Sequence, residues 1–434
     1  MAHDNRTLLT NIFRSGIDAV NGWNAVRAVV RTTSSSVRIA GKPYLFSRIN
    51  KIVVIGAGKA SFAMARALDE LLGARIHSGI VITKEGHGGR LDHIEVAEAS
   101  HPLPDMRGVR ATRRLLSLAR TVDRDTLLIV LLSGGASSLL VAPDGISLSD
   151  KIKTTSLLLN AGACIDELNT VRKQLSLVKG GGLGRMFYPA QIVTLIISDV
   201  MGNRLDIIGS GPTVIDGSTP EQALDVLARY GISNKVPRDV IRRLEQKKHA
   251  AVPTALHPRT RNIIIADNTK AVDACAKAVR RLGIRPVVLT TSLHGEAREA
   301  GHVLASIAGE MKRSKKKAGT RIGIISSGET TVTVAGTGKG GRNQELALSF
   351  AMDIQGQKGI SLLSAGTDGT DGPTDAAGAF VDNTTVHRIQ LKGMDPSAYL
   401  MNNDSYTALQ KAGALLKTGA TGTNVMDIQL ILIS

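Results

Sequence analysis

The chain has 434 residues, of which 43% are hydrophobic and 3% aromatic, and its net charge is +17. This length exceeds what one hydrophobic core usually supports, so two domains are expected. Few aromatic side chains and no nucleic-acid-binding motif argue against a nucleic-acid partner, despite the positive charge. No apolar run reaches the length of a membrane span and the N-terminus lacks a secretory signal pattern, so we expect a cytoplasmic protein without membrane contact.

Strand and helix patterns alternate along the first half of the chain. Helical spacing of apolar residues covers 5–33, and alternating strands and helices follow over 51–55, 60–72, 79–83, 105–119, 127–132, 149–164, 166–177 and 192–197. Apolar strands separated by helices are typical of a mostly parallel sheet with both faces covered. We therefore expect an α/β fold with a larger Rossmann-like domain over residues 1–255.

A polar segment over 245–261 is the expected linker, and the alternation resumes beyond it. Strands are predicted over 262–266, 286–290, 321–326, 330–335, 360–365 and 423–433, and helices over 269–282, over 295–311 and from near 342 and 403. These elements predict a smaller C-terminal α/β domain over residues 256–434.

The first glycine-rich loop, Gly56-Ala57-Gly58-Lys59, joins a strand to a helix. It matches half of the dinucleotide-binding fingerprint, but Ser61 stands at the third glycine position. Two interpretations remain: backbone N–H groups and Lys59 that bind an anion, or a tight turn with a surface lysine.

Further loops of this domain carry small or charged residues. Ser133, Gly134 and Gly135 follow a predicted central strand and suit a carboxylate or phosphate ligand better than covalent catalysis, because no Gly-x-Ser-x-Gly elbow surrounds them. Arg172 and Lys179-Gly180 bracket a helix end that is either an anion-facing loop or a glycine cap. Other candidates are Asp199 at a strand end, as a Mg²⁺ ligand, a base or a cap, and Gly211 shortly after it.

The C-terminal domain contributes a cationic and an anionic loop, both rich in glycine. Arg342 belongs to the first, and Asp368 and Asp371 follow an apolar strand in the second. Glu329 joins two predicted strands and is either a turn residue or part of the site. The pairing of these loops suggests chemistry on a phosphate.

Taken in order, the loops resemble those of the class II glycerate 2-kinases, whose C-terminal part is the MOFRL domain. The motifs are GAGKA, LSGGASSLL, NTVRKQLSLVKGG, SDVMGNRLDIIGSGPT, SGETTVTVAGTGKGGRNQEL, AGTDGTDGPTDAAGA and TGATGTNVMD. The sequence departs from the family pattern at Ala136, Ser327 and Ala420. The resemblance implies ATP-dependent phosphorylation of D-glycerate at its 2-hydroxyl, an active site between the two domains, and a need for Lys59 and Arg342.

We therefore predict Lys59, Arg342 and Asp199 as catalytic residues, with Asp199 as the anchor for Mg²⁺ and ATP as cosubstrate. The expected substrate contacts are Ser133, Gly134, Gly135 and Arg172; the expected nucleotide phosphate contacts are Gly56, Gly58, Lys179, Gly180 and Gly211; further acidic candidates are Glu329, Asp368 and Asp371. The expected assembly is a monomer or homodimer. The alternative activity is that of an NAD(P)H-dependent hydroxypyruvate reductase, which is suggested by the partial dinucleotide-binding pattern of the Gly56–Lys59 loop.

Overall fold

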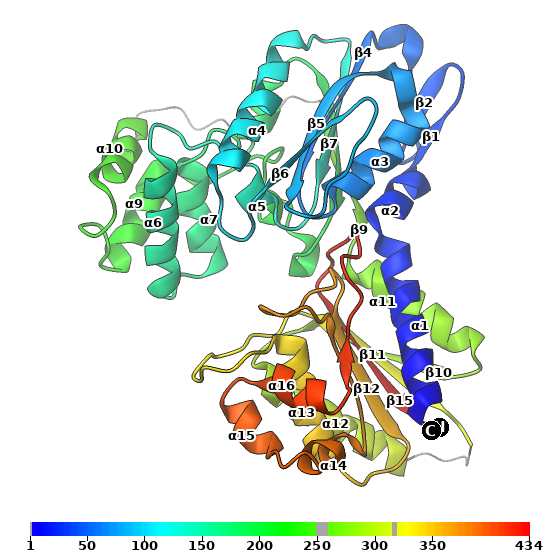
Figure 1. Cartoon of the computed structure of the whole chain (residues 1–434). Coiled ribbons are helices and arrows are strands. Elements are labelled where there is room, and N and C mark those ends of the chain that lie inside the picture. Colours follow the sequence, from blue (N-terminus) through cyan, green and yellow to red (C-terminus); the bar gives the residue numbers. More distant parts are fainter. Residues whose placement is uncertain (1, 249–258, 315–318) are drawn as a thin grey trace. The chain divides into compact units, whose positions relative to one another are not determined.

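The computed structural model describes residues 2–248, 259–314 and 319–434. Contacts divide the chain into two compact units, one made of residues 22–265 and the other of residues 1–21 and 266–434. This division differs from the predicted limits of 1–255 and 256–434 at the N-terminal helix and at the boundary between the units, which lies after residue 265. Helix α1 (Ala2–Val20) packs against α11 (Asn268–Arg281) of the second unit, alongside which it runs in Figure 1. No helix in the described ranges is both long and apolar enough to cross a membrane.

The unit of residues 22–265 is built on a six-stranded sheet with the order β6-β5-β4-β7-β8-β9. The pairs from β6 to β8 are all parallel, which confirms the predicted parallel sheet. Every residue of β7 is buried, as expected for a central strand covered on both faces. The strands are β4 (Lys51–Ala57), β5 (Ile76–Lys84), β6 (Glu95–Ala99), β7 (Thr126–Leu132), β8 (Gln191–Ile197) and β9 (Thr260–Ala266).

Helices of this unit either cover the sheet or form a separate cluster. Helix α3 packs on β4 and β5, and α4 packs on β5 and β6. Helices α6, α7, α9 and α10 share their own core, which includes Leu158, Leu168 and Leu227, and lie together beside the sheet in Figure 1. Helices α9 and α10 were not predicted. The helices are α2 (Gly22–Val29), α3 (Ser61–Leu72), α4 (Met106–Ser117), α5 (Ala136–Leu139), α6 (Leu148–Asn160), α7 (Ile165–Gln174), α8 (Gly182–Met186), α9 (Pro220–Arg229) and α10 (Arg238–Lys247).

A small antiparallel sheet replaces the end of the helix predicted over 5–33. It consists of β1 (Val30–Thr32), β2 (Ser36–Ile39) and β3 (Lys42–Leu45). The prediction was wrong here because the apolar spacing continued into Val29, Val30 and Thr32, whose β-branched side chains favour a strand.

The other unit holds a mixed six-stranded sheet with the order β10-β11-β15-β12-β13-β14. Only β10 and β11 pair in parallel, and the C-terminal β15 lies antiparallel between β11 and β12. The strands are β10 (Arg285–Leu293), β11 (Ile322–Gly328), β12 (Ile360–Gly366), β13 (Gly378–Asp382), β14 (Leu415–Leu416) and β15 (Asp427–Ile433); the helices besides α1 and α11 are α12 (Ala297–Arg313), α13 (Arg342–Asp353), α14 (Thr385–Gln390), α15 (Pro396–Met401) and α16 (Ser405–Lys411). Two α/β units confirm the predicted fold class.

The strand predicted over 330–335 is a loop held by side chains. Asn403 Oδ1 accepts hydrogen bonds from the N–H groups of Ala335 at 2.8 Å and Gly336 at 2.9 Å. Glu296 accepts from the Thr333 N–H group at 3.0 Å. Thr331 alone forms a bridge to the backbone at Glu296 in this described segment, and the prediction was wrong because distant side chains satisfy the N–H groups of Thr333 and Ala335.

Candidate functional site

The Gly56–Lys59 loop is bound to the Ser133–Gly135 loop where β4 and β7 end. Lys59 N–H donates to Gly134 O at 2.8 Å, and Ala60 N–H donates to Ser133 Oγ at 3.0 Å. Gly58 has a φ of +135°, and a Cβ there would lie 2.1 Å from Ser133 Oγ, so only glycine permits this approach. Backbone donors expected to bind an anion are therefore engaged within the unit, and the Lys59 side chain is the charged group that the loop contributes.

The second loop keeps two backbone donors available. Ser133 is fully buried, and its hydroxyl is used by Ala60. In the described part of the chain, the N–H groups of Gly134 and Gly135 have no acceptor. The position of a Cβ on Gly135 would be 2.8 Å from His101 Cδ2 and 3.5 Å from Lys59 Cγ, so both side chains lie beside this glycine. Two N–H groups next to a lysine stem can receive a carboxylate or phosphate oxygen.

A polar chain links three elements behind this loop. Ser137 Oγ lies 2.8 Å from Ser210 Oγ, which donates to Asn169 Oδ1 at 3.0 Å. Lys179 Nζ donates to Ser137 O at 2.9 Å. The N–H group of Gly180 donates to Ser210 O and that of Gly181 donates to Gly211 O, so these bonds join the two loops, whereas the Gly211 N–H group donates locally to Ile208 O.

Lys151, Arg172 and Lys179 lie in the same region and form no ion pair with a carboxylate in the described part of the chain. Lys179 is 2% exposed and Lys151 is 5% exposed. Burial lowers the pKa of Lys179 well below its usual value, and Arg172 and Lys151 lower it further. Burial, followed by Arg172, lowers the pKa of Lys151 to about 7. Sequence reasoning identified Arg172 and Lys179 but missed Lys151, although its spacing from the buried Thr154 and Leu158 places it on the inner face of α6.

Asp199 lies two residues beyond β8, at the carboxyl edge where the loops described above also lie. No group of three or more His, Cys, Asp and Glu side chains arranged for a metal occurs in residues 2–248, 259–314 and 319–434. Mg²⁺ in kinases is commonly held by one or two carboxylates together with substrate phosphates. A single carboxylate such as Asp199 fits that mode of binding.

In the other unit, Arg342 begins α13 and is tied to two acidic side chains. Its Nε donates to Asp427 Oδ2 at 2.6 Å and its Nη2 to Asp427 Oδ1 at 3.0 Å, while Nη1 bonds to Glu329. Asp427 is 1% exposed, and Glu329 is solvent-exposed. Burial lowers the pKa of Arg342, but Asp427 and Glu329 outweigh it and raise the value. Asp427, the first residue of β15, was not among the predicted residues.

The two predicted aspartates of the Gly366–Gly372 loop have different surroundings. Asp371 Oδ1 accepts from Asn343 N–H and Nδ2, and Oδ2 accepts from Gln344 N–H and Nε2. Both oxygens thus accept from N–H groups in the first turn of α13. Burial and the neighbouring Asp427 raise the pKa of Asp371 to about 6. Asp368 is partly exposed and accepts from Thr370 in a local turn.

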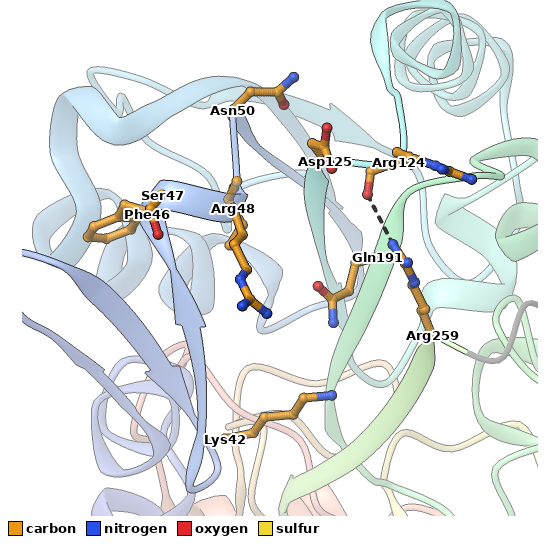
Figure 2. A pocket seen from close by; sticks show the side chains of 10 residues that line it. Lys42, Phe46, Ser47, Arg48, Asn50, Arg124, Asp125, Gln191 and Arg259 are labelled. Atoms are coloured by element: carbon orange, nitrogen blue, oxygen red, sulfur yellow. Dashed lines mark hydrogen bonds between the residues drawn. The ribbon is translucent and has the colours of Figure 1, made fainter.

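A pocket at the opposite edge of the parallel sheet is lined by several cations. Figure 2 shows it in front of the amino ends of β4, β7 and β8, with Arg259 donating to Arg124 O at 3.3 Å. Its residues are Lys42, Phe46, Ser47, Arg48, Ile49, Asn50, Arg124, Asp125, Gln191 and Arg259. Ligands of open α/β sheets bind at the carboxyl ends of the strands, so this pocket is not the candidate catalytic site.

Comparisons with known proteins identify the family to which the chain belongs. Residues 8–245 match a domain of unknown function (DUF4147), and residues 322–427 match the MOFRL family. The D-glycerate 2-kinase of Thermotoga maritima is 46% identical over 389 residues, covering 89% of this chain and 91% of that protein. A putative hydroxypyruvate reductase of Agrobacterium vitis is 43% identical, covering 88% and 87%. The crystal structure of glycerate kinase from Thermotoga maritima superposes with a TM-score of 0.87 at 42% identity over 100% of both chains. The chain belongs to the class II glycerate kinase family, with its DUF4147 and MOFRL regions.

Proposed function

We propose that this protein uses ATP to phosphorylate D-glycerate at its 2-hydroxyl, which yields 2-phosphoglycerate and ADP. The observation that carries the proposal is the presence of basic side chains next to the Ser133–Gly135 loop, where Lys179 Nζ donates to Ser137 O at 2.9 Å. Phosphoryl transfer spreads negative charge over the γ-phosphoryl oxygens, so a site for it needs fixed cations and N–H donors.

We assign Lys59 and Arg342 to the charge that develops on the transferred phosphoryl group. Lys59 belongs to one unit and Arg342 to the other. The N–H groups of Gly134 and Gly135 would hold the glycerate carboxylate. Asp199 would anchor Mg²⁺, which supplies neutralising charge on the nucleotide phosphates.

The acceptor hydroxyl must lose a proton to a base. Asp371 is poorly suited, because its two oxygens already accept four N–H donors at the start of α13. Asp368 accepts from Thr370 in a local turn and is more exposed to solvent than the buried Asp371. We therefore favour Asp368 over Asp371 as the base, with Asp371 positioning the helix that begins at Arg342.

The alternative, hydroxypyruvate reduction with NAD(P)H, is supported by the similarity to the Agrobacterium vitis protein. Dinucleotide folds bind the pyrophosphate with free N–H groups of the first strand–helix loop. Here the N–H groups of Gly58, Lys59, Ala60 and Ser61 donate to Ile82 O, Gly134 O, Ser133 Oγ and Gly58 O. This loop therefore disfavours the reductase.

One preparation of the protein can test both activities. ADP release would be measured with D-glycerate and MgATP, and phosphorus NMR would identify the phosphorylated carbon. NADPH oxidation would be followed with hydroxypyruvate in a parallel assay. Glycerate-dependent ADP release with 2-phosphoglycerate as product is expected; NADPH oxidation without ADP release would refute the kinase.

A further inference from the structure

Lys151 is a buried lysine that has no partner among the described residues of its unit. Its Nζ has no hydrogen-bond partner in the described part of the chain, and neither does Arg172 Nε. Lys151, Arg172 and Lys179 form no ion pair among the described residues. The undescribed residues, 1, 249–258 and 315–318, contain no Asp or Glu that could serve as a partner.

Other basic residues in the same group of helices do have carboxylate partners. Lys173, next to Arg172 on α7, lies 3.2 Å from Asp216 and 3.9 Å from Asp206. Arg243 and Lys247 of α10 share Asp144. Within residues 2–248, 259–314 and 319–434, carboxylates therefore pair with these neighbouring cations and with none of Lys151, Arg172 and Lys179. An uncompensated buried charge is costly, so two buried lysines beside an arginine, none of them paired with a carboxylate among the described residues, are unlike an ordinary packing solution.

We propose that Lys151 completes, with Arg172 and Lys179, a buried receptor for a phosphate group that carries two negative charges. A carboxylate brings one charge and two oxygens, which cannot match three cations. A phosphate group brings about two charges and three acceptor oxygens. Lys179 Nζ contacts Ser137 O, so the receptor lies directly behind the Ser133–Ser138 loop. The inference rests on the proposed function, in which the phosphate group belongs to ATP or to the phosphorylated product.

The test replaces Lys151 by methionine, which keeps the length and removes the charge. Lys153→Met on the exposed side of the same helix is the matched control. Binding of inorganic pyrophosphate, 2-phosphoglycerate and D-glycerate would be measured by calorimetry without turnover. Removing one charged donor should weaken the phosphate ligand roughly ten- to hundredfold. D-glycerate affinity should stay unchanged, and the control should match the wild type.

The two phosphate probes distinguish the source of the ligand. A loss confined to pyrophosphate assigns the receptor to the nucleotide, and a loss confined to 2-phosphoglycerate assigns it to the product. A wild type that binds neither, or a Lys151→Met protein with unchanged affinity for both, overturns the proposal. Since no turnover is needed, Lys151-dependent binding can be found even where the glycerate assay fails.

A second readout separates a binding role from a structural one. In anion-free buffer, Lys151→Met should melt at the same temperature as the wild type or higher, because an unpaired buried charge has been removed. Added pyrophosphate should then raise the melting temperature of the wild type more than that of the variant. Above pH 7 the wild-type affinity should fall as Lys151 loses its proton, and the variant should lack this step.

Discussion

Replacing Arg342 by methionine should lower stability as well as activity. The guanidinium makes two hydrogen bonds to Asp427, a carboxylate that is 1% exposed. Removing one partner of a buried ion pair typically costs about 3–5 kcal/mol, because the remaining charge is left unpaired. The exposed contact to Glu329 should add little. For a unit of this size, such a loss corresponds to a melting temperature lower by roughly 6–20 °C.

The double variant Arg342→Met/Asp427→Asn separates the structural effect from catalysis. It also removes the Asp427 carboxylate that Arg342→Met leaves unpaired, so the double variant should regain about half of the stability that the single variant loses. Under the proposed role of Arg342 in stabilising the transferred phosphoryl group, kcat should nevertheless stay about 10²–10³-fold below that of the wild type. Arg342→Lys keeps a charge but not the two-pronged geometry, so it should fall between the wild type and Arg342→Met.

The pH dependence of the single variant gives an independent check. Burial raises the pKa of Asp427, while Arg342 lowers it. Without Arg342 the pKa rises further above its unfolded value, so the folded variant binds a proton more tightly than the unfolded one. The difference in stability between the wild type and Arg342→Met should therefore become smaller as the pH falls from 8 to 5.

Thermal melts across this pH range and the ADP-release assay at 25 °C would measure these effects. Equal melting temperatures of Arg342→Met and the wild type would refute the claim that Arg342 compensates a buried charge. Wild-type kcat in the double variant would show that Arg342 serves only to pair Asp427.

Three further changes test other parts of the site. Lys59→Met should lower kcat by about 10²–10³-fold with a melting temperature close to that of the wild type; a change in KM alone would contradict the assigned role. Gly58→Ala places a Cβ 2.1 Å from Ser133 Oγ at a φ of +135° and should lower the melting temperature more than Gly73→Ala, where φ is +50° and the added Cβ meets nothing within 4 Å. Because burial raises the pKa of Asp371 to about 6, wild-type stability should increase as the pH falls from 7 to 5, whereas Asp371→Asn should lack this increase; a pH-independent difference between the two melting temperatures would contradict the assignment.

The parallel sheet was predictable because burial on both faces leaves an unambiguous pattern. Strand β7 consists of Thr126 followed by six apolar residues, and all seven are buried. The loops after such strands are rich in glycine and serine, which the sequence displays directly. The segment 330–335 was mispredicted for the opposite reason. The N–H groups of Thr333 and Ala335 donate to the side chains of Glu296 and Asn403, and no local sequence pattern indicates contacts with residues so far away in the chain.

Local sequence context also decides which residues of the candidate site could be predicted. Lys59, Arg342 and Asp199 stand in glycine-rich or strand-end contexts that mark functional loops. Asp427 opens a strand that was predicted from 423, and nothing near it in sequence reveals that Arg342 binds it. Its importance follows from the register of β15, which places Asp427 opposite Gly328 and Gly366 at the ends of both neighbouring strands.

Lys151 shows why charge counts alone are misleading in this chain. A net charge of +17 suggests a basic surface, and an isolated lysine in a helix is ordinarily solvated. Yet α6 buries Lys151 on the face that it shares with Thr154 and Leu158. Because Lys151 is buried, its charge needs a negative partner. The carboxylates of Asp216 and Asp144 form ion pairs with Lys173, Arg243 and Lys247 instead. The net charge of a sequence does not reveal such a buried, unpaired lysine, and it is this lysine that indicates an anionic ligand.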